Sequence, residues 1–298
     1  MDKEKFGHLK TESRNPRTLH LDTMSTMELL RIMNEEDQKV IDTIKDALLQ
    51  IEKSIQLVIR ALNHNGRLIY MGAGTSGRLG ILDAVECTPT FSTTDEVMGI
   101  MAGGEKAFAK AVEGAEDSAE LAAKDLEDIQ ISEKDVVAAI AASGRTPYAI
   151  GALKHAKKRG AKCISLTCNK DSILSKYADV AIEVDAGPEV LTGSTRLKAG
   201  TCQKIILNMI STASMVGIGK VYGNLMVDMK ATNLKLMERA KRIVMESTGC
   251  NIDTAVKTLE LTDYNSKEAI VMILTGITKE EASMRIRENH GFVRKCIR

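Results

Sequence analysis

The sequence contains no tryptophan, and aromatic residues make up only 3% of its 298 positions. Proteins that bind single-stranded nucleic acids stack bases on aromatic side chains, so this scarcity argues against that class. The formal net charge is only +1, and lysine and arginine are spread along the chain. No surface for a polyanion is predicted, and we expect no nucleic-acid partner.

Long apolar runs are also missing. No apolar stretch approaches the length of a membrane span, so we expect no membrane association. The N-terminal stretch MDKEKFGHLKTESRNPR is charged and lacks the apolar segment of a signal peptide, which favours a cytoplasmic protein. The six cysteines show no CxxC spacing and the histidines are isolated, so the sequence predicts no metal centre.

The periodicity of the apolar residues predicts an α/β fold. Helical spacing extends from Leu21 to Asn63, where Asn63-His64-Asn65-Gly66 ends it. Five short apolar runs then alternate with helical stretches, which is typical of a three-layer sandwich with a five-stranded parallel sheet. The runs are Leu68–Met71, Val97–Met101, Val136–Ala141, Cys163–Leu166 and Val180–Val184; the helices are Arg78–Glu86, Phe108–Leu126, Tyr148–Lys158, a short one at Ser172–Tyr177, and Thr195 to about Met215.

Strand patterns stop after Asn224. The remaining sequence predicts only helices, at Leu234–Met245, Asp253–Leu261, Lys267–Leu274 and Glu280–Glu288, the last opened by a Thr278–Glu281 capping box. The chain is therefore expected to have three parts: a helical N-terminal arm at 1–50, an α/β domain at 51–222, and a small helical domain at 223–298.

Loops rich in glycine, serine and threonine mark the candidate binding site. Gly72–Gly77 and Ser143–Thr146 each follow a buried strand and precede a helix, and Ala102–Gly104 and Thr192–Arg196 have similar compositions. Unpaired N–H groups at a helix start, together with small hydroxyls, suit a phosphate monoester. Two such loops suggest one phosphorylated ligand held from both sides, with Arg145 or Arg196 as a charge partner.

Other interpretations of these residues remain open. The first loop lacks the lysine of a P-loop, and its GxGxxG spacing lacks the acidic residue that a dinucleotide site needs, so a tight strand-to-helix turn is an alternative. The arginines are equally compatible with a solvated surface. Asp83 and Glu86 share a helix face, and Glu116 lies in an acidic stretch, so both glutamates are also compatible with solvated helix surfaces.

Longer motifs carry a family resemblance. MGAGTSGRLG (71–80), ASGRTP (142–147) and GPEVLTGSTRLKAGT (187–201) resemble the sugar-isomerase (SIS) domain. With LGILDAVECTPTF, AVEGAEDS and KVYGNLMVDMKATNLKL, the chain is similar to the N-acetylmuramic acid 6-phosphate etherases from about Leu21 to Phe292. The resemblance implies a lyase that releases D-lactate without metal or organic cofactor, a homodimer, and a small UBA-like C-terminal domain.

The resemblance also implies the site residues. Glu86 matches the acid that protonates the departing lactate oxygen, and Glu116 matches the group that transfers the C2 proton, although the division of roles stays open. The implied substrate-binding residues are Gly74, Thr75, Ser76, Ser143, Gly144, Arg145, Thr146, Ser194, Arg196 and Lys198. The alternatives are a non-catalytic sugar-phosphate sensor, like the glucokinase regulatory protein, and an aldose–ketose isomerase.

Overall fold

The structure is a computed structural model that describes residues 9–110 and 112–298. The chain forms two compact units, one made of Met1–Ala84 and Glu96–Ser211 and the other of Val85–Asp95 and Thr212–Arg298. The expected three-part division at residues 50 and 222 remains a prediction.

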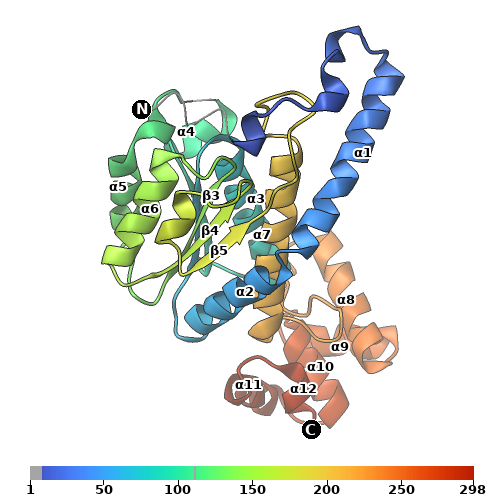
Figure 1. The fold of residues 1–298 in the computed structure, drawn as a ribbon. Helices are drawn as coiled ribbons and strands as arrows, with labels where there is room; N and C mark the ends of the chain where they lie inside the picture. Colours follow the sequence, from blue (N-terminus) through green and yellow to red (C-terminus); the bar gives the residue numbers. More distant parts are fainter. Residues whose placement is uncertain (1–8, 111) are drawn as a thin grey trace. The chain divides into compact units, whose positions relative to one another are not determined.

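A five-stranded parallel sheet forms the centre of the first unit, as predicted (Figure 1). The strands are β1 (Leu68–Gly72), β2 (Val97–Met101), β3 (Val136–Ala141), β4 (Lys162–Thr167) and β5 (Val180–Glu183), in the spatial order β2-β1-β3-β4-β5. Because β1 pairs with both β2 and β3, the strand order reverses beside β1. Ligand sites of such sheets lie at the carboxyl ends of the strands near this reversal.

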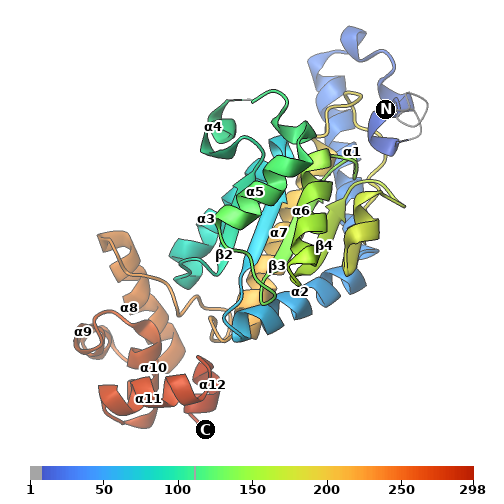
Figure 2. The same cartoon turned by 90° about the vertical axis from the view of Figure 1, so that its left-hand side faces the viewer.

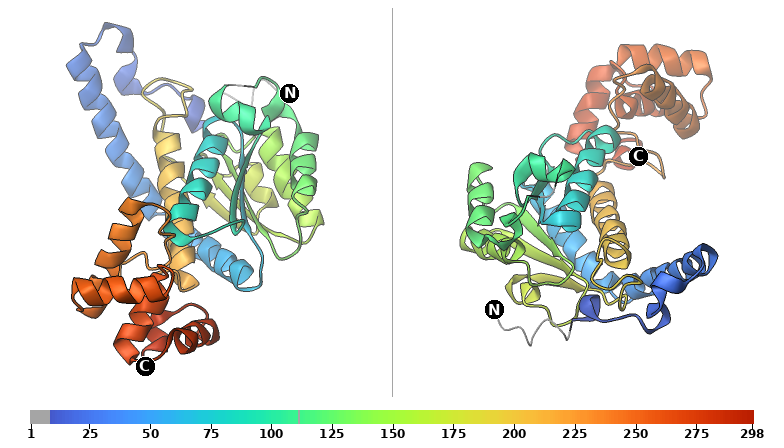
Figure 3. Two further views of the ribbon diagram at one scale, coloured as in Figure 1. Left: turned by 180° about the vertical axis from the view of Figure 1, so that it is seen from behind. Right: turned by 90° about the horizontal axis from the view of Figure 1, so that it is seen from above.

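Helices cover both faces of the sheet, which confirms the three-layer sandwich. On one face, Ile69, Met71 and Val137 pack with α5 (Ala119–Asp128) and α6 (Pro147–Lys158), which lie together in Figure 2. On the other face, Tyr70 contacts α3 (Gly74–Phe91) and α7 (Lys198–Gly217). These two helices lie side by side in Figure 3. Alternate residues of β1 therefore face opposite layers.

The N-terminal helical region is divided into two α-helices. Helix α1 (Thr26–Lys45) begins at a capping box between Ser25 and Glu28, and α2 (Leu48–Asn63) follows after a short break. Short 3₁₀ helices precede them at Lys10–Glu12 (η2), Pro16–Thr18 (η3) and Leu21–Thr23 (η4). As predicted, α2 stops before Asn65, which has a φ of 59°.

The predicted continuous helix at Phe108–Leu126 is wrong. In place of one helix, the structure has α4 (Gly104–Ala109), the 3₁₀ helix η5 (Ala115–Asp117), and then α5. Gly114 adopts a φ of 76°, a left-handed conformation that interrupts an α-helix. Ser118 then starts α5 by accepting a hydrogen bond from the N–H of Leu121. The predicted short helix near Ser172 is the 3₁₀ helix η6 (Leu174–Tyr177).

The C-terminal helices of the second unit surround their own apolar core. They are α8 (Leu234–Thr248), α9 (Ile252–Leu261), α10 (Ser266–Thr275), α11 (Lys279–Glu288) and α12 (Val293–Cys296). The core includes Ile243, Leu259 and Ile270, and the predicted capping box opens α11. Similarity to a UBA domain stays a prediction. Among the described helices, none combines the length and apolar character of a membrane span.

Candidate active site

The first glycine-rich loop forms a close turn between β1 and α3. A side chain at Gly72 would lie 2.9 Å from the N atom of Gly77, and one at Gly77 would lie 2.6 Å from the O atom of Gly72. Gly74, the first residue of α3, has a φ of 54°, which non-glycine residues rarely adopt. The turn therefore brings the first N–H groups of α3 to the end of β1.

The second loop repeats this arrangement after β3. The Ser143 Oγ accepts a hydrogen bond from the N–H of Arg145 at 3.2 Å, and Pro147 occupies the first position of α6. A side chain at Gly144 would lie 2.4 Å from the Cβ of Ser172, so this glycine is required for packing. The first N–H groups of a helix have no intrahelical partners and carry a partial positive charge. Both loops therefore end at helix starts that suit an anion.

A cavity of about 410 Å³ lies between the two loops. Three of the expected binding residues contribute from each side of it: Gly74, Thr75 and Ser76 from the first loop, and Ser143, Arg145 and Thr146 from the second. The full lining is Glu12, Ala73, Gly74, Thr75, Ser76, Glu116, Asp117, Ile140, Ala141, Ala142, Ser143, Arg145, Thr146, Pro147 and Thr195. The two loops therefore meet around one site, and this site has carboxylates at its edge.

Glu116 reaches this cavity because α4 and α5 do not join into one continuous α-helix. It lies in η5, after the left-handed Gly114, and both Glu116 and Asp117 line the cavity. Glu116 also lines a second cavity of about 270 Å³, whose walls include Met101, Ala107 and Val112. The sequence was also compatible with Glu116 on the acidic surface of one long helix. That helix does not form, so this alternative does not describe the position of Glu116.

Glu86, unlike Glu116, does not line this cavity. It is exposed on α3 and is not among the residues that line the cavity of its own chain. It stands ten positions after Ser76 in the same helix, which corresponds to about 15 Å of helix. Leu82 and Val85, on the same part of α3, are 46% and 60% exposed. Glu86 therefore lies on an exposed, partly apolar strip of helix.

Asp83 is not part of a solvated helix face. Its carboxylate is buried and accepts hydrogen bonds from Asn208 Nδ2 at 2.6 Å and Ser211 Oγ at 3.1 Å, both on α7. Burial raises the pKa of the Asp83 carboxyl, while the hydrogen bonds lower it. The solvated helix face that the sequence also allowed for Asp83 and Glu86 therefore does not include Asp83, whose hydrogen bonds join α3 to α7.

The motif at 187–201 contributes fewer residues to the cavity than the family resemblance implied. Thr195 lines it, whereas Ser194, Arg196 and Lys198 do not. Arg196 is exposed, and the Lys198 ammonium is buried and lies 2.7 Å from a Glu36 carboxylate oxygen. Gly144 also stays outside the lining. The structure thus pairs Lys198 with Glu36 and not with the cavity, and its implied substrate-binding role stays a prediction.

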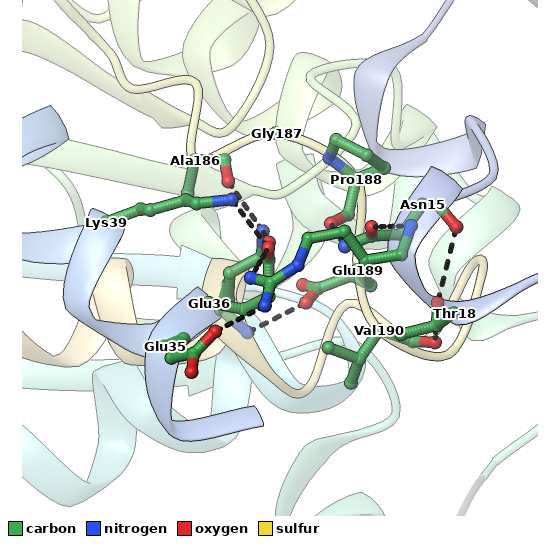
Figure 4. Close-up of polar contacts among 12 residues, drawn as sticks. Asn15, Thr18, Glu35, Glu36, Lys39, Ala186, Gly187, Pro188, Glu189 and Val190 are labelled. Atoms are coloured by element: carbon green, nitrogen blue, oxygen red, sulfur yellow. Dashed lines mark hydrogen bonds and ion pairs between the residues drawn. The ribbon is translucent and has the colours of Figure 1, made fainter. Parts of the chain in front are cut away.

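The Lys198–Glu36 pair belongs to a charge network that joins α1 to the segment before α7 (Figure 4). Glu36 and Lys198 are each only 2% exposed, and Glu36 also accepts hydrogen bonds from Lys39 at 2.5 Å and Arg17 at 3.1 Å. Lys198 Nζ donates in addition to the carbonyl of Ala186. Burial alone would raise the pKa of the Glu36 carboxyl, but the hydrogen bonds from Lys198 and Lys39 lower it from 4.5 to about 2.

Replacing Glu36 with glutamine is expected to destabilise the protein by about 3–5 kcal/mol at neutral pH, because Lys198 would keep a buried charge without its partner. Since the folded-state pKa of Glu36 is depressed to about 2, its contribution is complete above about pH 4.5 and is lost as the pH falls from there towards 2. Urea unfolding of both proteins across this range should show a shallower pH dependence in the variant.

Glu35→Gln is the matched control for this measurement. Glu35 is the neighbouring carboxylate, it is exposed, and it pairs with the partly exposed Arg17. Exposed ion pairs contribute about 0–1 kcal/mol, so this variant should keep both the stability and the pH dependence. Equal pH dependence in wild type and Glu36→Gln would contradict the role assigned to the buried network.

Among residues 9–110 and 112–298, no group of three or more histidine, cysteine, aspartate or glutamate side chains is placed to hold a metal ion. The sequence analysis missed one carboxylate of the cavity, Glu12, which comes from the 3₁₀ helix η2. It stands more than a hundred residues from the other lining carboxylates in sequence, in a stretch without strand or helix periodicity. No local signal connects it with the glycine-rich loops.

Comparison with known families agrees with this geometry. Residues 50–157 match the family described as "Glucokinase regulatory protein N-terminal SIS domain", and residues 115–213 match the "SIS domain". A solved phosphoheptose isomerase from Francisella tularensis superposes with a TM-score of 0.52 and 17% identity, covering 65% of this chain and 100% of its own. At that identity, the likeness concerns the fold alone.

Curated relatives are similar over nearly the whole chain. An N-acetylmuramic acid 6-phosphate etherase from Bacillus cereus (strain ATCC 10987 / NRS 248) is 57% identical over 97% of this chain and 99% of its own. One from Geobacillus sp. (strain WCH70) is 59% identical over 97% of this chain and 98% of its own. The matches therefore include the C-terminal helices as well as the sheet.

Proposed function

The chain belongs to the N-acetylmuramic acid 6-phosphate etherases, and on this premise we propose how its cavity performs their reaction. The enzyme is a carbon–oxygen lyase that cleaves the D-lactyl ether and yields N-acetylglucosamine 6-phosphate and D-lactate. We place it in the cytoplasmic recycling of cell-wall amino sugars. The observation that carries the proposal is that two glycine-rich loops at helix starts and Glu116 line one cavity.

The phosphate binds between the two loops. The starts of α3 and α6 direct N–H groups towards it, and the hydroxyls of Thr75 and Thr146 add donors. The carboxylates of Glu116 and Asp117 repel an anion, so they face the sugar and not the phosphate. This division orients the substrate, with its phosphate at the loops and its C2 and C3 atoms towards the acidic edge.

The chemistry requires an acid and a base but no redox group. When the sugar ring opens, C1 becomes an aldehyde and the C2 proton becomes acidic. A base removes that proton, the bond from C3 to the lactyl oxygen breaks, and an acid protonates the departing oxygen. Water then adds to C3 while C2 regains a proton. We assign the C2 proton transfer to Glu116 and protonation of the lactyl oxygen to Glu86.

Glu86 needs a second copy of the chain to perform this role. It lies about 15 Å along α3 from the phosphate loop, too far to reach C3 of a sugar held there. The exposed Leu82 lies four residues before Glu86 on the same face of α3, and such apolar exposure favours a covering protein surface. We therefore propose a homodimer in which Glu86 of one copy completes the cavity of the other.

The direct test is to incubate the purified protein with N-acetylmuramic acid 6-phosphate and measure D-lactate with a coupled D-lactate dehydrogenase assay. We expect stoichiometric release of D-lactate and N-acetylglucosamine 6-phosphate, because the cavity holds both the phosphate loops and the acid–base edge. Addition of a chelator should leave the rate unchanged, since the mechanism uses only carboxylates.

A substrate without the 6-phosphate, N-acetylmuramic acid, is the control and should react far more slowly. A non-catalytic sugar-phosphate sensor would bind the substrate but release no D-lactate. An aldose–ketose isomerase would convert an unsubstituted sugar phosphate and leave the ether intact. Either of these outcomes would contradict the etherase assignment.

A further inference from the structure

Glu12 contributes a carboxylate to the cavity that the proposed chemistry does not use. It is the last residue of the 3₁₀ helix η2 and lines the cavity together with Glu116. Its Oε2 lies 3.5 Å from the position that a Cβ at Gly193 would occupy, so the carboxylate sits beside the 192–196 loop. Within residues 9–110 and 112–298, its side chain has no hydrogen-bond or ion-pair partner.

The segment that carries Glu12 is fixed by buried polar contacts. The Asn169 side chain is 3% exposed and accepts a hydrogen bond from the N–H of Lys10 at 2.9 Å. Its Nδ2 donates to Thr11 Oγ1 at 3.1 Å and to the carbonyl of Ala142 at 3.0 Å. Ala142 directly precedes the second phosphate loop. The buried side-chain amide of Asn169 thus connects the two residues before Glu12 with the residue before the second loop.

Two further contacts hold the following residues of the segment (Figure 4). The buried Asn15 donates from Nδ2 to the carbonyl of Pro188 at 3.3 Å, and the buried Thr18 donates from Oγ1 to the carbonyl of Val190 at 2.8 Å. Both acceptors lie in the segment that leads to Thr195, which lines the cavity. The fold therefore fixes the backbone around an exposed carboxylate that binds no other residue in the described part of the chain.

We propose that Glu12 is a substrate-contacting specificity residue whose carboxylate accepts a hydrogen bond from a hydroxyl or amide group of the sugar. This inference rests on the proposed function and deepens it. An ionised carboxylate is an acceptor only, and it repels phosphate. The N-acetylated sugar is the part of the ligand that offers O–H and N–H donors. Glu12 therefore selects the sugar, and the two loops bind the phosphate.

The test compares two ligands on the same proteins. Titration calorimetry with N-acetylglucosamine 6-phosphate and with inorganic phosphate would be performed on wild type, Glu12→Ala and Glu12→Gln. We expect Glu12→Ala to weaken binding of the sugar phosphate by about ten- to hundredfold, because hydrogen bonds to charged groups are strong. Inorganic phosphate should bind equally well or more tightly, and Glu12→Gln should be intermediate for the sugar phosphate.

Lys10→Gln is the matched control, because Lys10 is an exposed side chain in the same 3₁₀ helix that does not line the cavity. It should bind both ligands like wild type. Unchanged sugar-phosphate affinity in Glu12→Ala would overturn the inference, as would an equal loss for both ligands, which indicates a structural role. A wild-type protein that releases no D-lactate would instead overturn the proposed function.

A double-mutant cycle tests whether the fixed segment acts through Glu12. Thr11→Val removes the hydroxyl that accepts from Asn169 but keeps the side-chain shape, so Glu12 should lose its fixed position. We expect weaker binding of N-acetylglucosamine 6-phosphate in this variant. The Thr11→Val/Glu12→Ala double variant should bind this ligand no more weakly than Glu12→Ala alone. Additive losses would contradict the proposed link.

Discussion

Replacing Glu116 with glutamine is expected to lower kcat for D-lactate release by about 10²–10⁴-fold, the usual contribution of a positioned acid–base group. Affinity for the sugar phosphate should change little, because we propose that the loops at 73–76 and 143–147, and not Glu116, bind the phosphate. Glutamine keeps the shape and a hydrogen-bonding oxygen but cannot accept the C2 proton. Steady-state kinetics combined with a binding measurement would separate the two effects.

Exchange at C2 adds a readout that a purely structural defect would not imitate. In deuterated water, wild-type enzyme should place deuterium at C2 of the product, because water returns the proton that the base removed. Glu86→Gln should also lower kcat strongly, but slow C2 exchange should persist, since this variant lacks the acid and keeps the base. Loss of exchange only in Glu86→Gln would show that the two roles are reversed.

Glu120→Gln is the matched control for Glu116. Glu120 lies in the same acidic stretch, in the first turn of α5, and does not line the cavity. Its replacement should leave kcat within about twofold of wild type, as is usual for surface substitutions. Full activity in Glu116→Gln would contradict the assignment of Glu116 to catalysis.

The fold was largely predictable because its signals are local. The five apolar runs each became a strand of the sheet, with ends differing by at most one residue. Buried parallel strands are apolar throughout, so their positions can be recognised without knowledge of their neighbours. The capping box at Thr278 and Glu281 is equally local, and it forms as expected.

The failed helix prediction has a physical explanation. Between Phe108 and Leu126 most residues favour a helix, but Gly114 takes a left-handed conformation, and Ser118 caps a new helix. Propensity summed along the sequence does not detect a break that tertiary contacts stabilise. This break determines the site, because it brings Glu116 and Asp117 to the cavity.

Long-range contacts explain what the sequence did not reveal about the site. Lys198 belongs to the 187–201 motif of the family resemblance and was an implied substrate-binding residue, but its partner is Glu36, 162 residues away in sequence. Glu12 reaches the cavity only because Asn169, Pro188 and Val190 hold the N-terminal segment. Such pairings depend on the tertiary fold, and no spacing within the sequence encodes them.

A dimer that combines two inactive variants is expected to recover D-lactate release. Suppose that each site uses Glu116 of one copy and Glu86 of the other. A dimer of one Glu116→Gln chain and one Glu86→Gln chain then contains one site that lacks both glutamates and one that is intact. Each variant alone should be nearly inactive, so the mixed dimer should recover activity that neither parent has.

The decisive measurement is therefore the D-lactate release rate of this mixed dimer, made by co-expressing the two variants with different affinity tags and purifying through both. The shared-site account predicts about half of the wild-type rate per dimer, because one of two equivalent sites is intact. Wild-type dimers carrying both tags control for the purification. A mixed dimer as inactive as its parents would contradict the account, since Glu86 and Glu116 would then have to act from the same chain.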